Sequence, residues 1–193
     1  MSKRHMAEPE RRSDRDLVDR YRQGDREAFA SIYQRHFHAV YRFAFYMTND
    51  GARAGEITQD VFIWFSGHAG QFDPLRGELG AFLGGVARKF VHRQQRQDQR
   101  WVPLEESSGR HSDRGAFRSG LERRDEAAGL RRAIAALPER YREAVVFCDL
   151  EGMSYEEAAA AMGCVVGTVR SRLFRARELL ARKFQRNSER QQC

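Results

Sequence analysis

The stretch that decides the fold is SYEEAAAAMGCVVGTVRSRLFRARELLAR, residues 154–182. It is typical of two helices joined by a tight turn. Ser154 and Glu157 form a capping-box pattern at the start of the first helix, and Gly163 stands where a left-handed residue ends it. Thr168 is predicted to cap the second helix, whose apolar residues recur at helical spacing. This arrangement predicts a helix-turn-helix, a motif that reads duplex DNA with its second helix.

The predicted second helix carries an excess of cationic side chains on its outward side. Residues 167–186 include seven basic residues and one acidic residue. Two ordinary interpretations compete with DNA binding, because a basic helix is often only a solvated face and a helix pair with a glycine turn is a common packing unit. The stretch alone leaves these alternatives open.

The charge of the whole chain favours a polyanionic partner. The 193 residues carry a formal net charge of +7, and a second basic stretch at residues 88–100 has five basic residues and one acidic residue. Two separated basic stretches suggest two contacts with one long polyanion. Three cysteines without a C-x-x-C pair fit a reducing compartment. No apolar run reaches membrane-spanning length, so a soluble, cytoplasmic protein with no membrane insertion is expected.

Helical periodicity recurs along most of the chain, and no strand pattern of any length appears. The predicted fold class is all-α, with two small helical domains joined by a flexible linker and the helix-turn-helix in the C-terminal one. Ser13 and Asp25 are expected to cap helices, and the turn at residues 49–51 to separate two more. The predicted organisation is a disordered tail (1–12), a helical domain (13–97), a flexible linker (98–124), the helix-turn-helix domain (125–186) and a second disordered tail (187–193).

Two parts of the sequence resemble a known family. LPERYREAVVFCDLEGMSYEEAAAAMGCVVGTVRSRLFRARELL (137–180) resembles the C-terminal domain of the extracytoplasmic-function group of bacterial sigma-70 factors. YRQGDREAFASIYQRHFHAVYRFA (21–44) and TQDVFIWF (58–65) resemble the core-binding domain of the same group. The resemblance implies a subunit that binds core RNA polymerase and directs promoter-specific initiation, reading the −35 element with the helix-turn-helix and opening −10 with the N-terminal domain.

The resemblance also implies roles for particular residues. In this group the helix at residues 58–65 docks on the clamp of the polymerase β′ subunit, although its polar residues also suit a plain solvated face. The implied polymerase contacts are Thr58, Gln59, Asp60, Phe62 and Trp64. Trp64 falls off the buried stripe that helical spacing assigns to Ile57, Val61 and Phe65, and it is the expected interface anchor.

The helix predicted at about residues 78–97 and the loop before it (70–77) correspond, by the resemblance, to the part that opens −10. Strand separation needs cations along the phosphates and an aromatic pocket for an unstacked base. The implied −10 residues are Phe72, Arg76, Arg88, Lys89, Arg93 and Arg96. The sequence departs from the family pattern at Lys89, where Asn is common, and at Arg93, where Asp is common. Both changes increase the attraction for DNA. The alternative interpretation of this basic stretch is a generic basic helix end, favoured by the helix dipole, with no role in −10 binding.

The second helix of the helix-turn-helix is expected in the major groove at −35. Its implied DNA-binding residues are Thr168, Arg170, Ser171, Arg172, Phe174, Arg175 and Arg177. Arg170, Ser171 and Arg175 are assigned to base edges or nearby contacts, since arginine offers bidentate donors to guanine. Thr168, Arg172, Arg177 and Arg182 are assigned to phosphates.

No catalytic, metal or cofactor site is predicted. His36 and His38 point in different directions on a helix, and Gly84-Gly85 match no phosphate loop. The expected partners are the polymerase core, promoter DNA and an anti-sigma protein. A stand-alone helix-turn-helix regulator is the nearest alternative, a partner-sequestering interaction protein a more distant one, and an enzyme the weakest.

Overall fold

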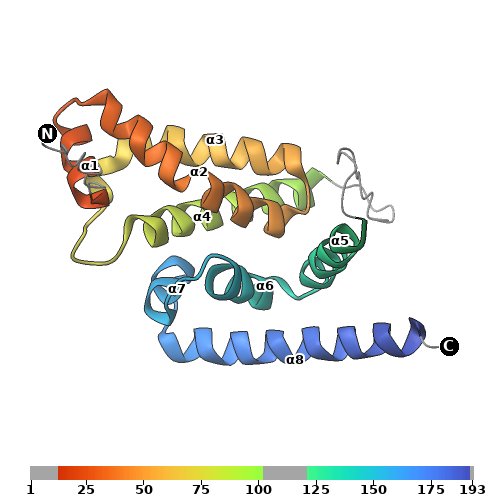
Figure 1. The fold of residues 1–193 in the computed structure, drawn as a ribbon. Helices are drawn as coiled ribbons and strands as arrows, with labels where there is room; N and C mark the ends of the chain where they lie inside the picture. Colours follow the sequence, from red (N-terminus) through yellow and green to blue (C-terminus); the bar gives the residue numbers. More distant parts are fainter. Residues whose placement is uncertain (1–12, 102–120, 192–193) are drawn as a thin grey trace, which may run out of the picture.

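The computed structural model describes residues 13–101 and 121–191, and within these ranges the chain forms helices and no strand (Figure 1). The elements are α1 (Asp14–Arg22), α2 (Arg26–Thr48), α3 (Gly51–His68), the 3-10 turn η1 (Ala69–Gln71), α4 (Leu79–Trp101), α5 (Leu121–Ala135), α6 (Glu139–Val145), the π turn η2 (Val146–Leu150), α7 (Tyr155–Met162) and α8 (Val166–Gln191).

The first helices begin and end at the residues expected to cap them. The side chains of Ser13 and Asp25 accept hydrogen bonds from backbone N–H groups in the first turns of α1 and α2. Asn49 ends α2 in the left-handed conformation, with φ of 54°, and Asp50 caps α3. These predictions are confirmed.

The N-terminal domain is a bundle in which α2 packs against α1, α3 and α4. Its interior is aromatic, with Phe65 fully buried and the rings of Tyr21 and Phe29 packed beside it. The Arg22 guanidinium donates hydrogen bonds to the carbonyl oxygens of Ala69 (2.8 Å) and Phe72 (2.6 Å). These bonds fix η1 and the start of the following loop against α1, and so position the loop beside α4.

The C-terminal domain contains a feature that periodicity does not predict. The pattern predicts one α-helix from Pro138 to Leu150, but α6 passes into the π turn η2 after Val145. The N–H of Glu151 donates to the Val146 carbonyl at 2.9 Å, five residues back. Phe147 lies in this turn and is fully buried.

The two domains share one hydrophobic core. Phe43 of α2 and Phe147 of η2 stack with their ring centroids 4.4 Å apart. Figure 1 shows α4 between the layer of α2 and α3 and the layer of α6 and α7. The sequence predicts two domains, but it does not predict that they pack into one body.

Three helix ends differ from the predicted domain boundaries. α4 continues to Trp101 and α5 begins at Leu121, so both enter the predicted linker. α8 continues to Gln191, into the predicted C-terminal tail. Residues 183–191 contain no Gly or Pro to end a helix, which accounts for the extension. The first predicted tail and linker residues 102–120 lie outside the described residues.

Candidate nucleic-acid and polymerase interfaces

The helix-turn-helix is formed by α7 and α8. The Ser154 N–H donates to Glu157 Oε2 at 2.7 Å and the Glu157 N–H donates to Ser154 Oγ at 3.2 Å, so the predicted capping box is confirmed. Gly163 ends α7 with φ of 62°. The prediction that Thr168 caps the second helix is wrong. Because left-handed Gly163 reverses the chain within two residues, α8 begins at Val166 and Thr168 lies in its first turn.

The outward face of α8 is polar and cationic. The predicted −35 residues that are exposed are Arg170, Ser171, Phe174, Arg175 and Arg177; Thr168 and Arg172 are half-buried. On the opposite side, Val169, Leu173 and Ala176 are buried against the rest of the domain. The helix lies along the edge of the molecule farthest from α3 (Figure 1), so this face is open.

Local partners hold several arginines of α8. Arg177 donates to both carboxylate oxygens of Asp149, at 2.5 and 3.2 Å, and these hydrogen bonds raise the pKa of its guanidinium. Arg175 lies 2.8 Å from Glu178. The Arg170 guanidinium carbon lies 5.6 Å from the centre of the Tyr155 ring. Exposed pairs of this kind are worth roughly 0–1 kcal/mol, so DNA phosphates can replace them.

The second cationic surface runs along α4. Arg88, Lys89, Arg93 and Arg96 recur at helical spacing and, with His92 and Gln97, line a cavity of about 540 Å³. Lys89, Arg93 and Arg96 are exposed. The Arg93 guanidinium lies over the Phe90 ring at 4.4 Å, and its Nη2 is 3.5 Å from the Asp60 carboxylate of α3.

A cavity of about 570 Å³ lies where the loop at residues 71–78 meets α4. Phe72 forms part of its wall, 4% exposed and packed edge-on to Phe82. Exposed Arg76 also lines it. Both cavities include Arg88 and Lys89, so the structure brings all the predicted −10 residues together. The far wall of the cavity belongs to α7 of the C-terminal domain.

Arg88 differs from the other cations of α4 because it faces the C-terminal domain. Its Nε lies 2.6 Å from Oε1 of Glu143 on α6, a carboxylate only 1% exposed. His92 Nε2 lies 2.9 Å from the same oxygen. Burial alone would raise the pKa of Glu143, but the hydrogen bond with His92 and the Arg88 charge hold it below its ordinary value.

The predicted polymerase residues divide between the core and the surface of α3. Thr58 is 1% exposed and its hydroxyl donates to the Ala54 carbonyl, and Phe62 is 3% exposed. These two side chains therefore support α3 from inside and offer no surface to a partner. Gln59 and Asp60 are exposed, while Trp64 is half-buried, stacks on His68 at 4.4 Å and lines the cavity beside the loop.

Sequence reasoning missed Ile63, which is 61% exposed. Glu56, Gln59, Asp60 and Ile63 are all exposed and follow the i, i+3, i+4, i+7 spacing of one helical face. An apolar side chain among polar ones is typical of an interface centre with a polar rim. The same spacing is present in the sequence, but Trp64 is the expected anchor there because it falls off the buried stripe of Ile57, Val61 and Phe65.

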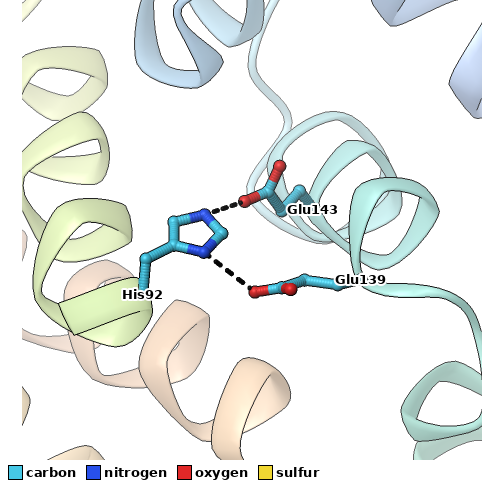
Figure 2. Close-up of side chains that lie close together, drawn as sticks. All are labelled: His92, Glu139 and Glu143. Carbon is cyan, nitrogen blue, oxygen red and sulfur yellow. Dashed lines mark hydrogen bonds and ion pairs between the residues drawn. The ribbon is translucent and has the colours of Figure 1, made fainter. Parts of the chain in front are cut away.

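His92, Glu139 and Glu143 form a group of metal-type ligands among the described residues (Figure 2). The two ring nitrogens of His92 face different carboxylates. Nε2 lies 2.9 Å from Glu143 Oε1, and Nδ1 lies 3.1 Å from Glu139 Oε1 without hydrogen-bond alignment. An imidazole that uses both nitrogens in this way bridges two acids instead of joining them around one cation. Arg88 also takes the Glu143 oxygen, so the geometry does not fit a metal centre.

Comparisons with known proteins decide the family. The model for sigma-70 region 2 matches residues 32–101, and that for sigma-70 region 4 matches residues 128–180. The RNA polymerase sigma-H factor of Pseudomonas aeruginosa is 30% identical over 189 residues, 89% of this chain and 94% of that protein. The ECF RNA polymerase sigma factor SigE of Mycolicibacterium smegmatis is 32% identical over 169 residues, 81% of this chain and 63% of that protein. The chain is an ECF-group sigma factor of the sigma-70 family.

A solved structure agrees with this assignment. The sigma factor RpoE of Bartonella quintana, crystallised in complex with the anti-sigma factor NepR, matches with a TM-score of 0.65 and 26% identity over 81% of this chain and 96% of that one. As a sigma factor, the protein directs RNA polymerase to promoters. Among the helices that the structure describes, none combines the length and apolar character needed to cross a membrane.

Proposed function

We propose that this sigma factor holds a promoter at two points, with α8 in the major groove at −35 and with α4 and the loop at residues 71–78 on the opened −10 element. The observation that carries the proposal is the presence of two separate cationic helices, one in each sigma region, with an aromatic-walled cavity beside the second. A stand-alone DNA-binding regulator has no use for the second surface.

At −35, the exposed side chains near the start of α8 meet base edges, and those farther along meet phosphates. Arg170 and Arg175 supply bidentate donors for guanine. Phe174, which is 62% exposed, offers an apolar contact of the kind that thymine methyl groups accept. Arg177 exchanges Asp149 for a phosphate.

At −10, Lys89, Arg93 and Arg96 follow the phosphates of a single strand. An unstacked base enters the cavity walled by Phe72 and Phe82, where it packs against aromatic side chains. Lys89 and Arg93 are cations at positions where the family commonly has Asn and Asp, so phosphate attraction contributes a larger share of this contact.

Core polymerase binds the exposed face of α3 formed by Glu56, Gln59, Asp60 and Ile63. Ile63 is the apolar centre of this face, and the three polar residues form its rim. The chemistry of RNA synthesis belongs to the polymerase, so we assign no catalytic role to this chain. Because it works with polymerase, we place it in the cytoplasm. The complex of the related Bartonella factor with an anti-sigma protein supports a similar inhibitory partner here.

Run-off transcription with purified core polymerase tests the proposal. Promoter-dependent transcripts are expected only when the chain is added to core. Binding to duplex DNA without any promoter-dependent initiation would instead favour the stand-alone regulator. Since the promoter sequence is not fixed by the residues, templates come from genomic fragments selected with the reconstituted holoenzyme.

Two variants separate the surfaces. Ile63→Glu places a charge at the apolar centre of the α3 face and is expected to abolish co-purification with core polymerase. Leu130→Glu changes an exposed leucine on α5 and serves as the matched control. Arg175→Ala should retain polymerase binding and lose −35 recognition, at a cost of about 1–3 kcal/mol in DNA affinity.

A further inference from the structure

Trp64 of α3 takes no part in the promoter and polymerase contacts proposed above. The family resemblance implies a polymerase anchor, but the exposed face of α3 is centred on Ile63. Successive residues of an α-helix are about 100° apart around its axis, so the Trp64 side chain leaves that face. It lines the cavity beside α4 and the loop at residues 71–78, together with Phe72 and Phe82. The indole therefore belongs to the surroundings of the proposed −10 site.

Three aromatic side chains form a connected group at this cavity. The centroid of the Phe82 ring lies 6.2 Å from that of the Trp64 indole and 5.6 Å from that of Phe72. Phe72 is buried, whereas Trp64 and Phe82 are half-buried, so part of the indole is open to a molecule in the cavity. The cavity volume of about 570 Å³ lies within the range of about 300–1,000 Å³ that is typical of small-molecule sites, so it can hold a single unstacked base.

His68 holds the indole in place. Its imidazole stacks on the indole with 4.4 Å between the ring centroids and 5° between the ring planes. Its Nδ1 lies 2.7 Å from the Trp64 carbonyl oxygen, and because a carbonyl oxygen only accepts hydrogen bonds, Nδ1 is the donor. The imidazole is thus tied to the last turn of α3 while it packs on the indole. A side chain that is already ordered loses less conformational entropy when it binds a ligand.

The indole also has a hydrogen-bond donor that the protein does not use. Within residues 13–101 and 121–191, Trp64 Nε1 has no hydrogen-bond partner, and it is not a buried atom. When a ligand covers such an N–H, the group needs an acceptor from that ligand. The ring nitrogens and carbonyl oxygens of nucleobases are acceptors of this kind. An aromatic wall with one free donor is therefore suited to a nucleobase.

The charges around the cavity are mixed. Arg76 and Lys89 are exposed and line it, and Asp73 and Glu78 line it as well. The two cations can take the phosphates on either side of a captured nucleotide. The base itself is uncharged, so the aromatic wall and the indole N–H supply the contacts that suit it.

We propose that Trp64 contacts a base of the opened −10 strand and is not the anchor for polymerase. The base packs against the indole in the cavity and accepts a hydrogen bond from Nε1. His68 is a positioning residue that keeps the indole in this orientation. The inference rests on the proposed assignment of α4 and the loop at residues 71–78 to −10 DNA.

Photo-cross-linking tests the contact in the holoenzyme without changing the protein. Promoter DNA carries 5-iodouracil at one position of the −10 segment at a time, and irradiation joins this base to an aromatic side chain that touches it. Mass spectrometry of the digested sigma factor locates the adduct. An adduct at Trp64 from one −10 position is expected. Adducts only at other residues, or none from any template that opens, would contradict the contact.

Substitutions at Trp64 separate the promoter role from the polymerase role. Trp64→Ala should lower promoter opening about tenfold, because it removes the packing against the base. Trp64→Phe keeps an aromatic wall and loses the donor, so a loss of about threefold is expected. Permanganate reactivity of unpaired thymines measures opening. Both variants should still co-purify with core polymerase, and loss of that binding would restore the anchor role and overturn the proposal.

A matched control comes from α2. Phe45→Ala removes another half-buried aromatic side chain, which packs against Tyr41 and does not line the cavity. This variant should change neither opening nor polymerase binding. Circular dichroism of each variant checks that its helices are intact. If Trp64→Ala is unfolded, Trp64→Phe and the cross-link decide the question.

An abasic nucleotide at the cross-linked position shows whether Trp64 acts through that base. Trp64→Ala should cause no further loss on the abasic template, because both changes remove the same contact. Equal losses on the normal and the abasic template would indicate a purely structural effect and contradict the proposal.

Lys89→Ala distinguishes this inference from the −10 assignment on which it rests. Reduced opening in both Lys89→Ala and Trp64→Ala is expected. Reduced opening in Lys89→Ala alone would retain α4 as the −10 surface and contradict the role of Trp64. Unchanged opening in both variants would contradict the −10 assignment itself.

Discussion

α8 and α4 both present arginines at helical spacing, but they occupy different places in the molecule. α8 lies along an outer edge, and Arg175 and Arg177 pair with acids of their own domain. α4 lies between two layers, and Arg88 pairs with buried Glu143 of the other domain. Charge patterning predicts DNA binding for both helices. Packing between residues distant in the sequence decides which arginines of the two helices are exposed and which are paired.

The energies of the two kinds of pair differ accordingly. An exposed pair such as Arg175–Glu178 contributes roughly 0–1 kcal/mol and exchanges readily with solvent or phosphate. A buried carboxylate such as Glu143 cannot lose its partners without a large desolvation cost. The α8 contacts can therefore change one side chain at a time, whereas freeing Arg88 requires movement of a domain.

The largest expected effect comes from the aromatic contact between the domains. Phe147→Ala removes a fully buried ring that stacks on Phe43 and should lower the free energy of unfolding by about 3–5 kcal/mol. Urea unfolding followed by circular dichroism measures the loss. Phe174→Ala is the matched control, because this exposed ring on α8 should contribute less than about 0.5 kcal/mol. Similar losses for the two variants would contradict the distinction between the covered and the open region.

The second effect concerns the buried carboxylate. Glu143→Ala leaves Arg88 and His92 without their shared partner. Breaking a fully buried pair costs about 3–5 kcal/mol, but the Arg88 and His92 side chains are both partly exposed and regain water, so we expect about 2–3 kcal/mol. Glu139→Ala, one turn away on α6 and contacting the same histidine, should cost under about 1 kcal/mol. Equal costs would mean that Glu143 does not hold the interface.

How much of this is predictable from sequence follows from the range of the interactions. Helix caps and turns depend on neighbouring residues only. The sequence therefore predicts the helix ends that the structure shows at Ser13, Asp25, Ser154 and Gly163. The prediction that Thr168 caps α8 is wrong because, in the sequence, a polar residue in the first turn of a helix cannot be distinguished from a polar residue at its N-cap. The π turn at residues 146–150 has no periodicity of its own and is invisible to a helical pattern.

The candidate sites show the same limit. The exposed arginines of α8 follow from helical spacing alone. The polymerase roles of Thr58 and Phe62 come from the family resemblance, whereas helical spacing places Phe62 with Ile57, Val61 and Phe65 on the buried side of α3. Thr58 lies on the same buried side. The pairing of Arg88 with Glu143 joins two domains across the linker. No local pattern predicts such a contact, because the sequence around a basic helical residue does not show whether its side chain will face water or a carboxylate.

A third effect tests whether the α8 pairs are as replaceable as their exposure indicates. Arg177→Ala should weaken duplex binding by the holoenzyme by about 1 kcal/mol, and reduce the slope of log affinity against log salt by about one. Arg15→Ala removes an exposed arginine from α1 and should change neither quantity. A loss that is confined to particular base sequences would reassign Arg177 from phosphate to base contact.

A smaller effect is expected in acid. The pKa of Glu143 lies below its ordinary value of 4.5, because His92 and Arg88 outweigh the effect of burial. The unfolded chain therefore takes up this proton first as the pH falls, so the stabilisation is complete above pH 4.5 and is lost as the pH drops through the lowered pKa. The pKa of Asp14 is also below its ordinary value, because the contacts with His36 and Arg35 outweigh the effect of burial. Asp14 lies outside the domain interface and adds a second contribution to the loss of stability in acid. Urea unfolding at several acid pH values should show a shallower pH dependence in Glu143→Ala, and an identical one would contradict the assignment.

The smallest expected effect is on the alkylation rate of the Cys148 thiol. This residue lies between the domain interface and the exposed helix α8. Cys148 lies in η2, between Phe147 of the interface and Asp149, which binds Arg177 of α8. Burial, and then the Asp149 carboxylate, raise the pKa of its thiol to about 11, with Arg177 acting in the opposite direction. The reactive thiolate is therefore scarce at neutral pH. With Cys164 and Cys193 replaced by serine, alkylation by iodoacetamide should be slow at neutral pH and should accelerate until the pH approaches 11.

Two variants then show which region protects the thiol. Arg177→Ala removes the cation that favours the thiolate, so alkylation should become slower still. Arg42→Glu removes the two hydrogen bonds that join α2 to Glu151 of the C-terminal domain. If it separates the domains, alkylation should become faster only where the N-terminal domain contributes to the burial of Cys148. An unchanged rate in an expanded variant would assign that burial to the C-terminal domain alone. A wild-type rate at neutral pH equal to that of an unstructured cysteine peptide would contradict the raised pKa itself.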